Sequence, residues 1–430
     1  MLRIKDIQKG LLHLVGWEQA EDDGRRILDF LTASESGLTF QQAHPLLTLD
    51  NIRSILPTPA QYDEWESGRT YASGEKCSYE GIIYICIADG GTANPPTTEG
   101  WRVYDQLSEY LLKLTNEGIA RVAAKMTEDK TLNRSSKQLF ERKTLFDVAG
   151  RTDNRVPNYG CLVGYEIQPL RGIGVTTQIH RIGLQFRTGT TVGEFPLTIY
   201  IFHSSTPQPI YTRVVTANPN GRYIWSEVAD VYLPYVGKET ASGGAWYVCY
   251  NQNDLPDGVE AVNISRDWSR EPCMTCNVGD VKAWRTMTKY IRVSPFRVAV
   301  AADFSDNPAC PMEKSVDYTK DTCYGMNLDL SIGCDVSDFI ISQRSMFATV
   351  LQKEVAVNAL RRIMYNPNVN VNRNQMNAAL QVDIEGSTYQ KSRGLAEELA
   401  KAYKALDLDT RGLDSACLAC TRRGVIYRGV

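Results

Sequence analysis

The sequence has few histidines and lacks the signature motifs of several large enzyme classes. Its 430 residues include four histidines, His13, His44, His180 and His203. Histidine is the side chain used most often for general acid–base catalysis and for metal binding. The chain contains no G-x-x-x-x-G-K-[ST], G-x-S-x-G or H-E-x-x-H motif, which mark phosphate-binding loops, hydrolase nucleophiles and zinc proteases. We therefore expect a protein that is not an enzyme, although the paired carboxylates of a glycosidase would leave no motif.

Long apolar runs and a strong net charge are also missing. No apolar segment approaches the roughly 20 residues that a membrane-spanning helix needs, so no membrane span is expected. The net charge of −3 provides no overall basic field for nucleic acid. The N-terminal stretch MLRIKDIQKGLLHLVGWEQ is broken by charges and precedes no small-residue cleavage site, which predicts an amphipathic helix and not a signal peptide. We expect a protein that is made and used in the cytoplasm, or that is assembled there into something later released.

Cysteines are present in an odd number, eleven, which argues against a fully paired secreted framework. The stretch PCMTC has the spacing of a zinc knuckle, and a tetrahedral site needs two more soft ligands. The candidate ligands of a structural zinc ion are Cys273, Cys276, Cys310 and Cys323. The CLAC pair, Cys417 and Cys420, is an alternative source that would tie the C-terminus to the β-rich region. Buried, reduced thiols are the competing interpretation, and no other cofactor is expected.

Apolar residues recur at helical spacing on both sides of a segment with a different composition. The helical pattern of the N-terminal region resumes after Trp101, where Gly118 is a candidate break. A loop insertion costs a scaffold little when its two ends are close. We therefore predict one helical domain from residues 1–57 and 102–150, with residues 62–101 as a small β insert.

The middle of the chain consists of short runs rich in β-branched and aromatic residues. Examples are TQIHRIGLQF, PLTIYIFHS and GAWYVCYNQ, with turn sequences such as NPNG and LPDG between the runs. This spacing predicts an antiparallel β-sandwich over residues 151–337. His180 and His203 fall on predicted strands, where we expect them to be packed or solvated. Residues 338–430 are predicted to form a C-terminal helical segment and tail, which makes the fold class α+β.

Arginines gather in the C-terminal region. The candidate DNA-facing residues are Arg361, Arg362, Arg422 and Arg423. Such a group could face the phosphates of DNA in a channel. The alternative is a solvated helix face, or pairing with carboxylates of a neighbouring subunit.

The insert carries a regular order of aromatic residues, glycines and prolines. This order is Trp65, Tyr71, Gly74, Tyr79, Gly81, Tyr84, Pro95, Pro96 and Trp101. It resembles the small chitin-binding-like modules of carbohydrate-binding families 5 and 12, although Glu75 and Cys86 depart from their pattern. The resemblance implies sugar binding, because aromatic faces can stack on sugar rings. The candidate sugar-binding residues are Trp65, Tyr71, Tyr84 and Trp101. In so small a module the same rings must also build the core, so a protein-contacting knob is the alternative.

A wider resemblance involves the remainder of the chain. Four segments carry it: EPCMTCNVGDVKAW, NLDLSIGCDVSDFIISQRSMFA, MYNPNVNVNRNQMNAAL and ALDLDTRGLDSACLAC. These segments resemble stretches of virion proteins from tailed phages of gut Bacteroidetes, which include the crAss-like phages. The segment LTNEGIARVAAKM, followed by NRSSKQLFER, resembles the helical core of head–tail adaptor proteins in that group. Together these resemblances extend over much of residues 102–150 and 268–425. The resemblance implies a structural component of the neck or short tail, which forms a ring of copies below the portal.

The expected function is therefore that of a structural virion protein. It would contact its own copies, the portal and other neck or tail proteins, with DNA in the channel and a carbohydrate-binding-like decoration on the outside. A glycan-binding protein for receptor recognition is the alternative, and a glycan hydrolase is a further one.

Overall fold

A computed structural model describes residues 2–19, 27–89, 91–129, 138–236, 244–266, 268, 270–271, 278–300, 304–306, 308–309, 316–319, 321–365, 380–386, 394–406 and 408–417. The chain divides into two compact units. The sheet unit comprises Met1–Leu2, Lys130–Phe339 and Thr410–Val430. The helical unit comprises Arg3–Asp129 and Ile340–Asp409. Antiparallel sheets build the first unit and helices most of the second, which confirms the predicted α+β class.

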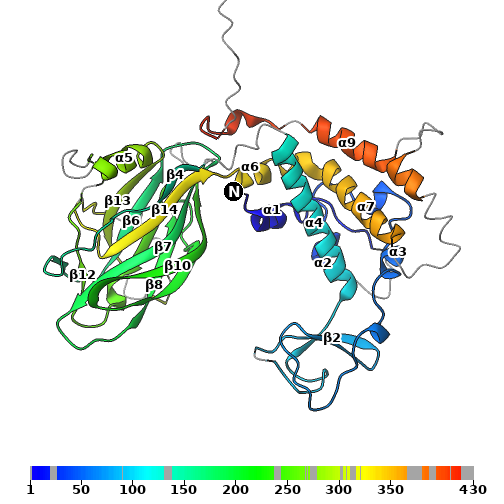
Figure 1. The fold of residues 1–430 in the computed structure, drawn as a ribbon, viewed down its shortest axis with the longest axis horizontal. Coiled ribbons are helices and arrows are strands. Elements are labelled where there is room, and N and C mark those ends of the chain that lie inside the picture. Colours follow the sequence, from blue (N-terminus) through cyan, green and yellow to red (C-terminus); the bar gives the residue numbers. More distant parts are fainter. Residues whose placement is uncertain are drawn as a thin grey trace, which may run out of the picture. The chain divides into compact units, whose positions relative to one another are not determined.

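The sheet unit contains two antiparallel sheets (Figure 1). In the six-stranded sheet the order is β4-β14-β7-β12-β5, with β10 also paired to β7. Its strands are β4 (Gln138–Thr144), β5 (Arg155–Val156), β7 (Val175–Thr188), β10 (Asn220–Pro234), β12 (Val259–Val262) and β14 (Met326–Cys334). The five-stranded sheet has the order β13-β6-β11-β8-β9. Its strands are β6 (Cys161–Pro169), β8 (Phe195–His203), β9 (Tyr211–Ala217), β11 (Trp246–Asn251) and β13 (Ile291–Ala299).

The main core of this unit lies between the two sheets. Ile182, Leu184 and Leu328 of the six-stranded sheet are buried together with Tyr165 and Val248 of the five-stranded sheet. Alternate residues of each strand therefore point inward, as in other antiparallel sandwiches. Helix α5 (Val278–Met287) adds Met287 to the same core.

A bulge in β7 changes which residues face away from this core. Ile179 pairs with Leu330, whereas Arg181 pairs with Asp329, so one additional residue of β7 is accommodated between the two pairs. Such a shift interrupts the regular alternation of a strand. His180 and Arg181 are consequently both half-buried, while Ile179 belongs to the core.

The helical unit combines helices from an N-terminal segment, Arg3–Asp129, and a C-terminal segment, Ile340–Asp409. Its helices are α1 (Ile4–Leu11), α2 (Asp29–Thr32), α3 (Leu49–Arg53), α4 (Gln106–Asp129), α7 (Ala348–Met364) and α9 (Leu395–Ala405). Helix α6 (Ser337–Ser342) spans the point where the chain passes from one unit to the other. The short 3₁₀ segments of the helical unit are η1 (Gln41–Ala43), η2 (Pro59–Gln61) and η6 (Arg344–Phe347). The segments η4 (Gln252–Asp254) and η7 (Thr410–Gly412) belong to the sheet unit.

Gly118 does not interrupt its helix; it allows α4 to approach α7. A Cβ atom at position 118 would lie 2.4 Å from Cγ2 of Val355 and 3.7 Å from Cδ1 of Leu351. Non-bonded carbon atoms do not approach as closely as 2.4 Å, so glycine fits here without a shift of the neighbouring helix. The expected break is wrong because close packing outweighs the low helix propensity of glycine.

The insert folds as a three-stranded antiparallel sheet. Its strands are β1 (Lys76–Tyr79), β2 (Ile82–Cys86) and β3 (Trp101–Val103), in that order. Glu80 and Gly81 connect β1 to β2 with φ angles of 52° and 76°. Two successive positive φ values match the type I′ turn of a two-residue hairpin. The local sequence thus sets the register of this sheet.

Two of the predicted domain boundaries need correction. Residues 138–144 form strand β4 of the sandwich, so the predicted helical range 102–150 extends too far. The C-terminal helices do not form a segment of their own, because α7 packs against α4 and both belong to the helical unit. Residues 410–417 return to the sheet unit.

Candidate functional site

The aromatic residues that characterise the insert build its core. Tyr71 is completely buried and Trp101 is 8% exposed, and they cluster with Cys77 and Cys86. The Tyr71 and Trp101 rings meet edge to face with their centroids 5.3 Å apart, and Nε1 of Trp101 donates a hydrogen bond to the carbonyl oxygen of Asn94 at 3.0 Å. A ring without exposed area cannot stack on a sugar. The prediction of sugar contact is therefore wrong for Tyr71, and Trp101 has little surface left for it.

The other two candidate sugar-binding residues retain some exposed surface. Trp65 and Tyr84 are half-buried against the core of the insert. Trp65 meets Tyr79 edge to face at 5.7 Å between centroids. The indole N–H of Trp65 is buried and has no hydrogen-bond partner among the described residues. For these two residues sugar binding stays a prediction.

The candidate DNA-facing arginines that the structure describes are paired with carboxylates of the same chain. Arg362 contacts Glu117 of α4, and Arg361 lies 2.6 Å from Glu385. The alternative expected carboxylates of a neighbouring subunit, but these partners belong to the same chain. Arg422 and Arg423 lie outside the described residues, so DNA contact stays a prediction.

Three of the four candidate zinc ligands, Cys273, Cys276 and Cys310, lie outside the described residues, as does Cys420. The fourth, Cys323, is buried in the sandwich, and its Sγ accepts a hydrogen bond from the Ile264 N–H at 3.1 Å. Burial raises the pKa of Cys323 to about 11, which keeps this thiol protonated at neutral pH. Within the described ranges no three His, Cys, Asp or Glu side chains come together as metal ligands. The zinc site stays a prediction.

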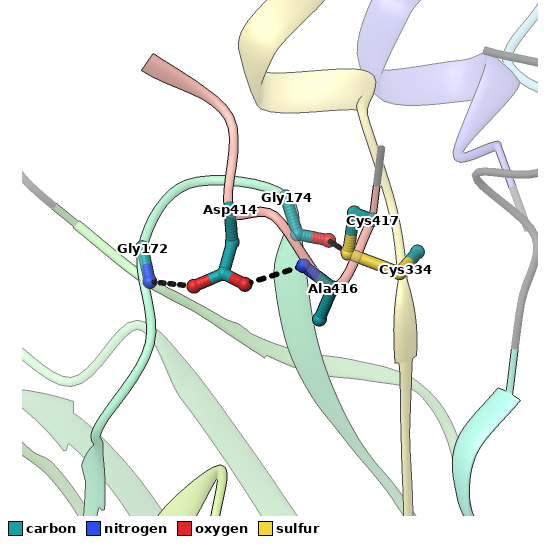
Figure 2. Close-up of a disulfide and its surroundings, with 6 residues drawn as sticks. All are labelled: Gly172, Gly174, Cys334, Asp414, Ala416 and Cys417. Atoms are coloured by element: carbon teal, nitrogen blue, oxygen red, sulfur yellow. Dashed lines mark hydrogen bonds between the residues drawn. A yellow bond between two sulfur atoms is a disulfide. The ribbon is translucent and has the colours of Figure 1, made fainter. Parts of the chain in front are cut away.

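Cys417 instead forms a disulfide bond with Cys334, across 83 residues of sequence (Figure 2). Cys334 ends strand β14, and the Cα atoms of the two cysteines are 5.5 Å apart. The CLAC alternative expected a zinc ion to tie the C-terminus to the β-rich region. The two regions are indeed joined, but by a disulfide between Cys417 and Cys334. The sequence did not indicate this disulfide, because eleven cysteines can be paired in many different ways.

Hydrogen bonds of Asp414 accompany the disulfide in residues 413–417 (Figure 2). The Asp414 carboxylate accepts bonds from the N–H groups of Gly172 at 3.0 Å and Ala416 at 2.8 Å. The N–H of Asp414 donates to the carbonyl oxygen of Ile173 at 2.9 Å. We call residues 413–417 the C-terminal clasp.

The outer face of the six-stranded sheet, opposite the sandwich core, carries a row of polar side chains that the sequence analysis missed. At one end the row is covered by residues 146–150. There the Gln185 side chain bonds to the backbone of Gly150 at 2.8 and 3.0 Å and of Gly221 at 2.8 Å. The Asn327 side chain likewise bonds to the N–H and carbonyl groups of Phe146 at 3.2 and 2.9 Å. Protein groups therefore satisfy the polar side chains at this covered end.

Two arginines share one buried carboxylate in the middle of the row. The Asp329 side chain is 2% exposed, and its Oδ2 lies 2.8 Å from Arg142 and 2.7 Å from Arg181. Burial by itself would raise the pKa of Asp329, but hydrogen bonds and charges from the two guanidinium groups outweigh it and lower that pKa. Asp329 is therefore ionised at neutral pH, and one negative charge faces two positive ones.

The other end of the row is open and forms a hollow of about 330 Å³. Nε2 of His180 lies 2.8 Å from Oγ of Ser331, and Nε2 of Gln178 donates to the Tyr232 hydroxyl at 3.4 Å. Burial, and next the charge of Arg142, lowers the pKa of His180, so the ring is neutral at neutral pH. Arg142, Asp335 and these four side chains line the hollow.

Sequence reasoning could not assemble this polar face. His180 was expected to be packed or solvated, and the shift that turns both His180 and Arg181 away from the core has no sequence signal. Arg142 lies in a segment predicted to be helical. The only available clue was the run of Asp329 and Ser331 at alternating positions between apolar residues of one strand.

Comparisons with known proteins do not place this chain in a family. No family model, no curated protein and no solved structure matches it. Within the part of the chain that the structure describes, every helix is too short or too polar to cross a membrane.

Proposed function

We propose that this chain is a structural, non-enzymatic virion protein of a phage head-to-tail connector or short tail. In this proposal it forms a ring of copies below the portal and contacts other neck or tail proteins. The sequence resemblance described above motivates the proposal, and the packing of the helical unit supports it.

The observation that carries the proposal is a close contact between two helices, one from each of the ranges 102–150 and 268–425 over which this resemblance extends. LTNEGIARVAAKM lies within α4, and NLDLSIGCDVSDFIISQRSMFA leads directly into α7. The two helices pack so closely that position 118 has no room for a Cβ atom beside Val355. Segments more than 200 residues apart in the sequence thus contribute to one helical core, as expected if both belong to an adaptor-like protein.

The insert supports a role in protein contacts more than one in sugar binding. Apolar surface remains on the sheet face that carries Cys86 and Trp101, since Ile82 is 44% and Val103 55% exposed. Val103 pairs with Tyr84 across β2 and β3, and Ile82 is two residues before Tyr84. Residues paired or spaced in this way share one face of a sheet. The face formed by Ile82, Tyr84 and Val103 offers a neighbouring virion protein a small apolar contact.

Stoichiometry tests the proposal. Head-to-tail contacts that close on themselves give rings, so we expect purified virions, or the isolated protein at high concentration, to contain closed rings of about a dozen copies. Cryo-electron microscopy of virions and mass photometry of the protein measure this. A stable trimer would contradict the connector proposal, and hydrolysis of a capsular glycan would contradict its non-enzymatic part.

A glycan-binding role in receptor recognition is the second candidate. It is favoured by the half-exposed rings of Trp65 and Tyr84. We expect Trp65→Ala and Tyr84→Ala to abolish any signal on a glycan array, whereas Ile87→Ala, which truncates an exposed residue of the same insert, should leave it unchanged. A signal that survives both aromatic substitutions would exclude the insert as its source.

A further inference from the structure

The two ends of the polar row on the six-stranded sheet differ in what their side chains bind. At the covered end Gln185 and Asn327 are satisfied by backbone groups. At the open end His180 bonds to Ser331 through Nε2, and its Nδ1 has no partner among the described residues. Buried or half-buried polar groups are normally hydrogen-bonded. The open end therefore presents polar groups that a ligand in the hollow could satisfy.

The charges beside the hollow favour an anionic group. Nε of Arg142 and Nε of Arg181 both point at the single oxygen Oδ2 of Asp329, at 2.9 and 2.7 Å. A guanidinium group has five N–H donors, so most donors of Arg142 are not used by Asp329. The Arg142 side chain is 45% exposed and lines the hollow. Carboxylates and phosphates are the anions that a planar guanidinium binds with two parallel hydrogen bonds.

Two other carboxylates, Glu227 and Asp335, lie near this cluster, and among the described residues neither forms an ion pair with Arg142. Glu227 is 3.9 Å from Arg181 and 76% exposed, so solvent screens it. Asp335 also lines the hollow, and its Oδ1 accepts a hydrogen bond from the Ser337 N–H at 2.8 Å. Asp335 directly follows β14 and lies six residues after Asp329, the carboxylate that Arg142 binds.

The remaining wall of the hollow suits hydroxyl groups. Ser331, His180, Gln178 and Tyr232 come from three adjacent strands and offer hydroxyl, imidazole and amide groups, each able to donate or accept. The volume of about 330 Å³ lies at the lower end of the range for small-molecule sites, which are usually more apolar than this one. A small ligand with several hydroxyl groups and one carboxylate matches this wall and these charges.

We propose that the hollow on the outer face of the six-stranded sheet binds one acidic monosaccharide unit of a glycan. Its carboxylate binds Arg142, and its hydroxyl groups bind His180, Ser331 and Gln178. This site is separate from the insert, and the proposal holds whether or not the chain is a connector protein.

Ligand-detected NMR on the full chain tests the proposal. The probes are the methyl glycosides of glucuronic acid, galacturonic acid and N-acetylneuraminic acid, with methyl glucoside and methyl galactoside as neutral counterparts. We expect saturation transfer to at least one acidic sugar and at least tenfold weaker binding of its neutral counterpart. Arg142→Ala should weaken the acidic sugar at least tenfold, since Arg181 still pairs with Asp329 in that variant.

Two further variants keep the test decisive. Arg155→Ala removes an arginine of the same sheet that pairs with Glu260 at 3.1 Å, away from the hollow, and should bind as the wild type does. Ser331→Ala leaves the Arg142–Asp329–Arg181 cluster intact and should also weaken binding. Failure of all three acidic sugars to bind, or equal binding to Arg142→Ala and wild type, would overturn the proposal. Inorganic phosphate that displaces the sugar at equal concentration would show a bare oxyanion site and overturn the saccharide assignment.

Discussion

At the scale of single residues, Gly118 shows packing winning over intrinsic helix propensity. Alanine is favoured over glycine inside a helix by about 1 kcal/mol. Here, however, the added Cβ would meet Val355 at 2.4 Å, and overpacking of this kind costs roughly 1–3 kcal/mol. We predict that Gly118→Ala lowers the free energy of unfolding of the helical unit, measured by urea denaturation. Val355→Ala makes room for the new methyl group, so Gly118→Ala should cost much less in that background; equal costs would show that α4 and α7 do not meet there.

Asp329 gives a second prediction at this scale, on pH dependence. Its folded-state pKa is lowered below 3.8 by Arg142 and Arg181. A lowered carboxyl pKa contributes stability that is present above the unfolded pKa and is lost as the pH falls through the folded pKa. We therefore expect Asp329→Asn to destabilise the sheet unit by about 2–3 kcal/mol at pH 7, less than a fully buried pair because both arginines are partly exposed. The difference from wild type should shrink below pH 4, as followed by thermal unfolding at several pH values.

The matched control for Asp329 is Asp153. Its pKa is also lowered, first by a hydrogen bond from Arg151, but this carboxylate lies on the surface. Solvent screens such pairs, so Asp153→Asn should leave the unfolding transition nearly unchanged at all pH values. If both substitutions behave alike, the pairing of Asp329 contributes nothing specific.

At the scale of secondary-structure elements, the insert is held by its rings and not by its short strands. Trp101 and Tyr71 fill the core of a sheet of only three strands, and truncation of a core aromatic to alanine costs about 3–5 kcal/mol. We predict that Trp101→Ala unfolds the insert alone. Hydrogen exchange should then become fast in residues 71–103 and stay slow in α4 and α7. Ile87→Ala, at a position that is 55% exposed, should change neither; fast exchange throughout the helical unit would contradict an independently held insert.

Elements with a local signal were predictable from the sequence, and those set by distant partners were not. The β-rich middle of the chain and the hairpin turn at Glu80–Gly81 follow from residue type and spacing. Strand β4 was predicted as helix because its conformation is decided by its pairing with β14, which lies more than 180 residues later in the sequence. The polar face needed the bulge beside His180 as well as that pairing. Likewise, aromatic spacing identified the insert, but only burial reveals that Tyr71 and Trp101 are structural.

At the scale of the whole molecule, the chain leaves the sheet unit after Phe339 and returns to it at Thr410. The disulfide between Cys334 and Cys417 brackets this excursion, and the C-terminal clasp holds its returning end through Asp414. The helical residues from Ile340 to Asp409 are therefore enclosed in one covalent loop. Reduction would leave the clasp with only its hydrogen bonds and its buried Leu413.

The covalent loop closed by Cys334 and Cys417 should stabilise the fold. Closing a loop of 83 residues reduces the entropy of the unfolded chain and stabilises the folded state by roughly 4–5 kcal/mol. We expect a reducing agent to lower the Tm of the wild type, and Cys417→Ser to show the lower Tm with or without it. Cys161→Ser is the matched control, because Cys161 is a half-buried free cysteine of the same unit; its Tm should still fall on reduction. On reduction the C-terminal clasp should detach first, because Cys417 is the clasp residue that the disulfide joins to β14. Hydrogen exchange at Asp414 and Ala416 should therefore accelerate before exchange in β14. A Tm of oxidised wild type that equals that of Cys417→Ser would show that this bond does not form.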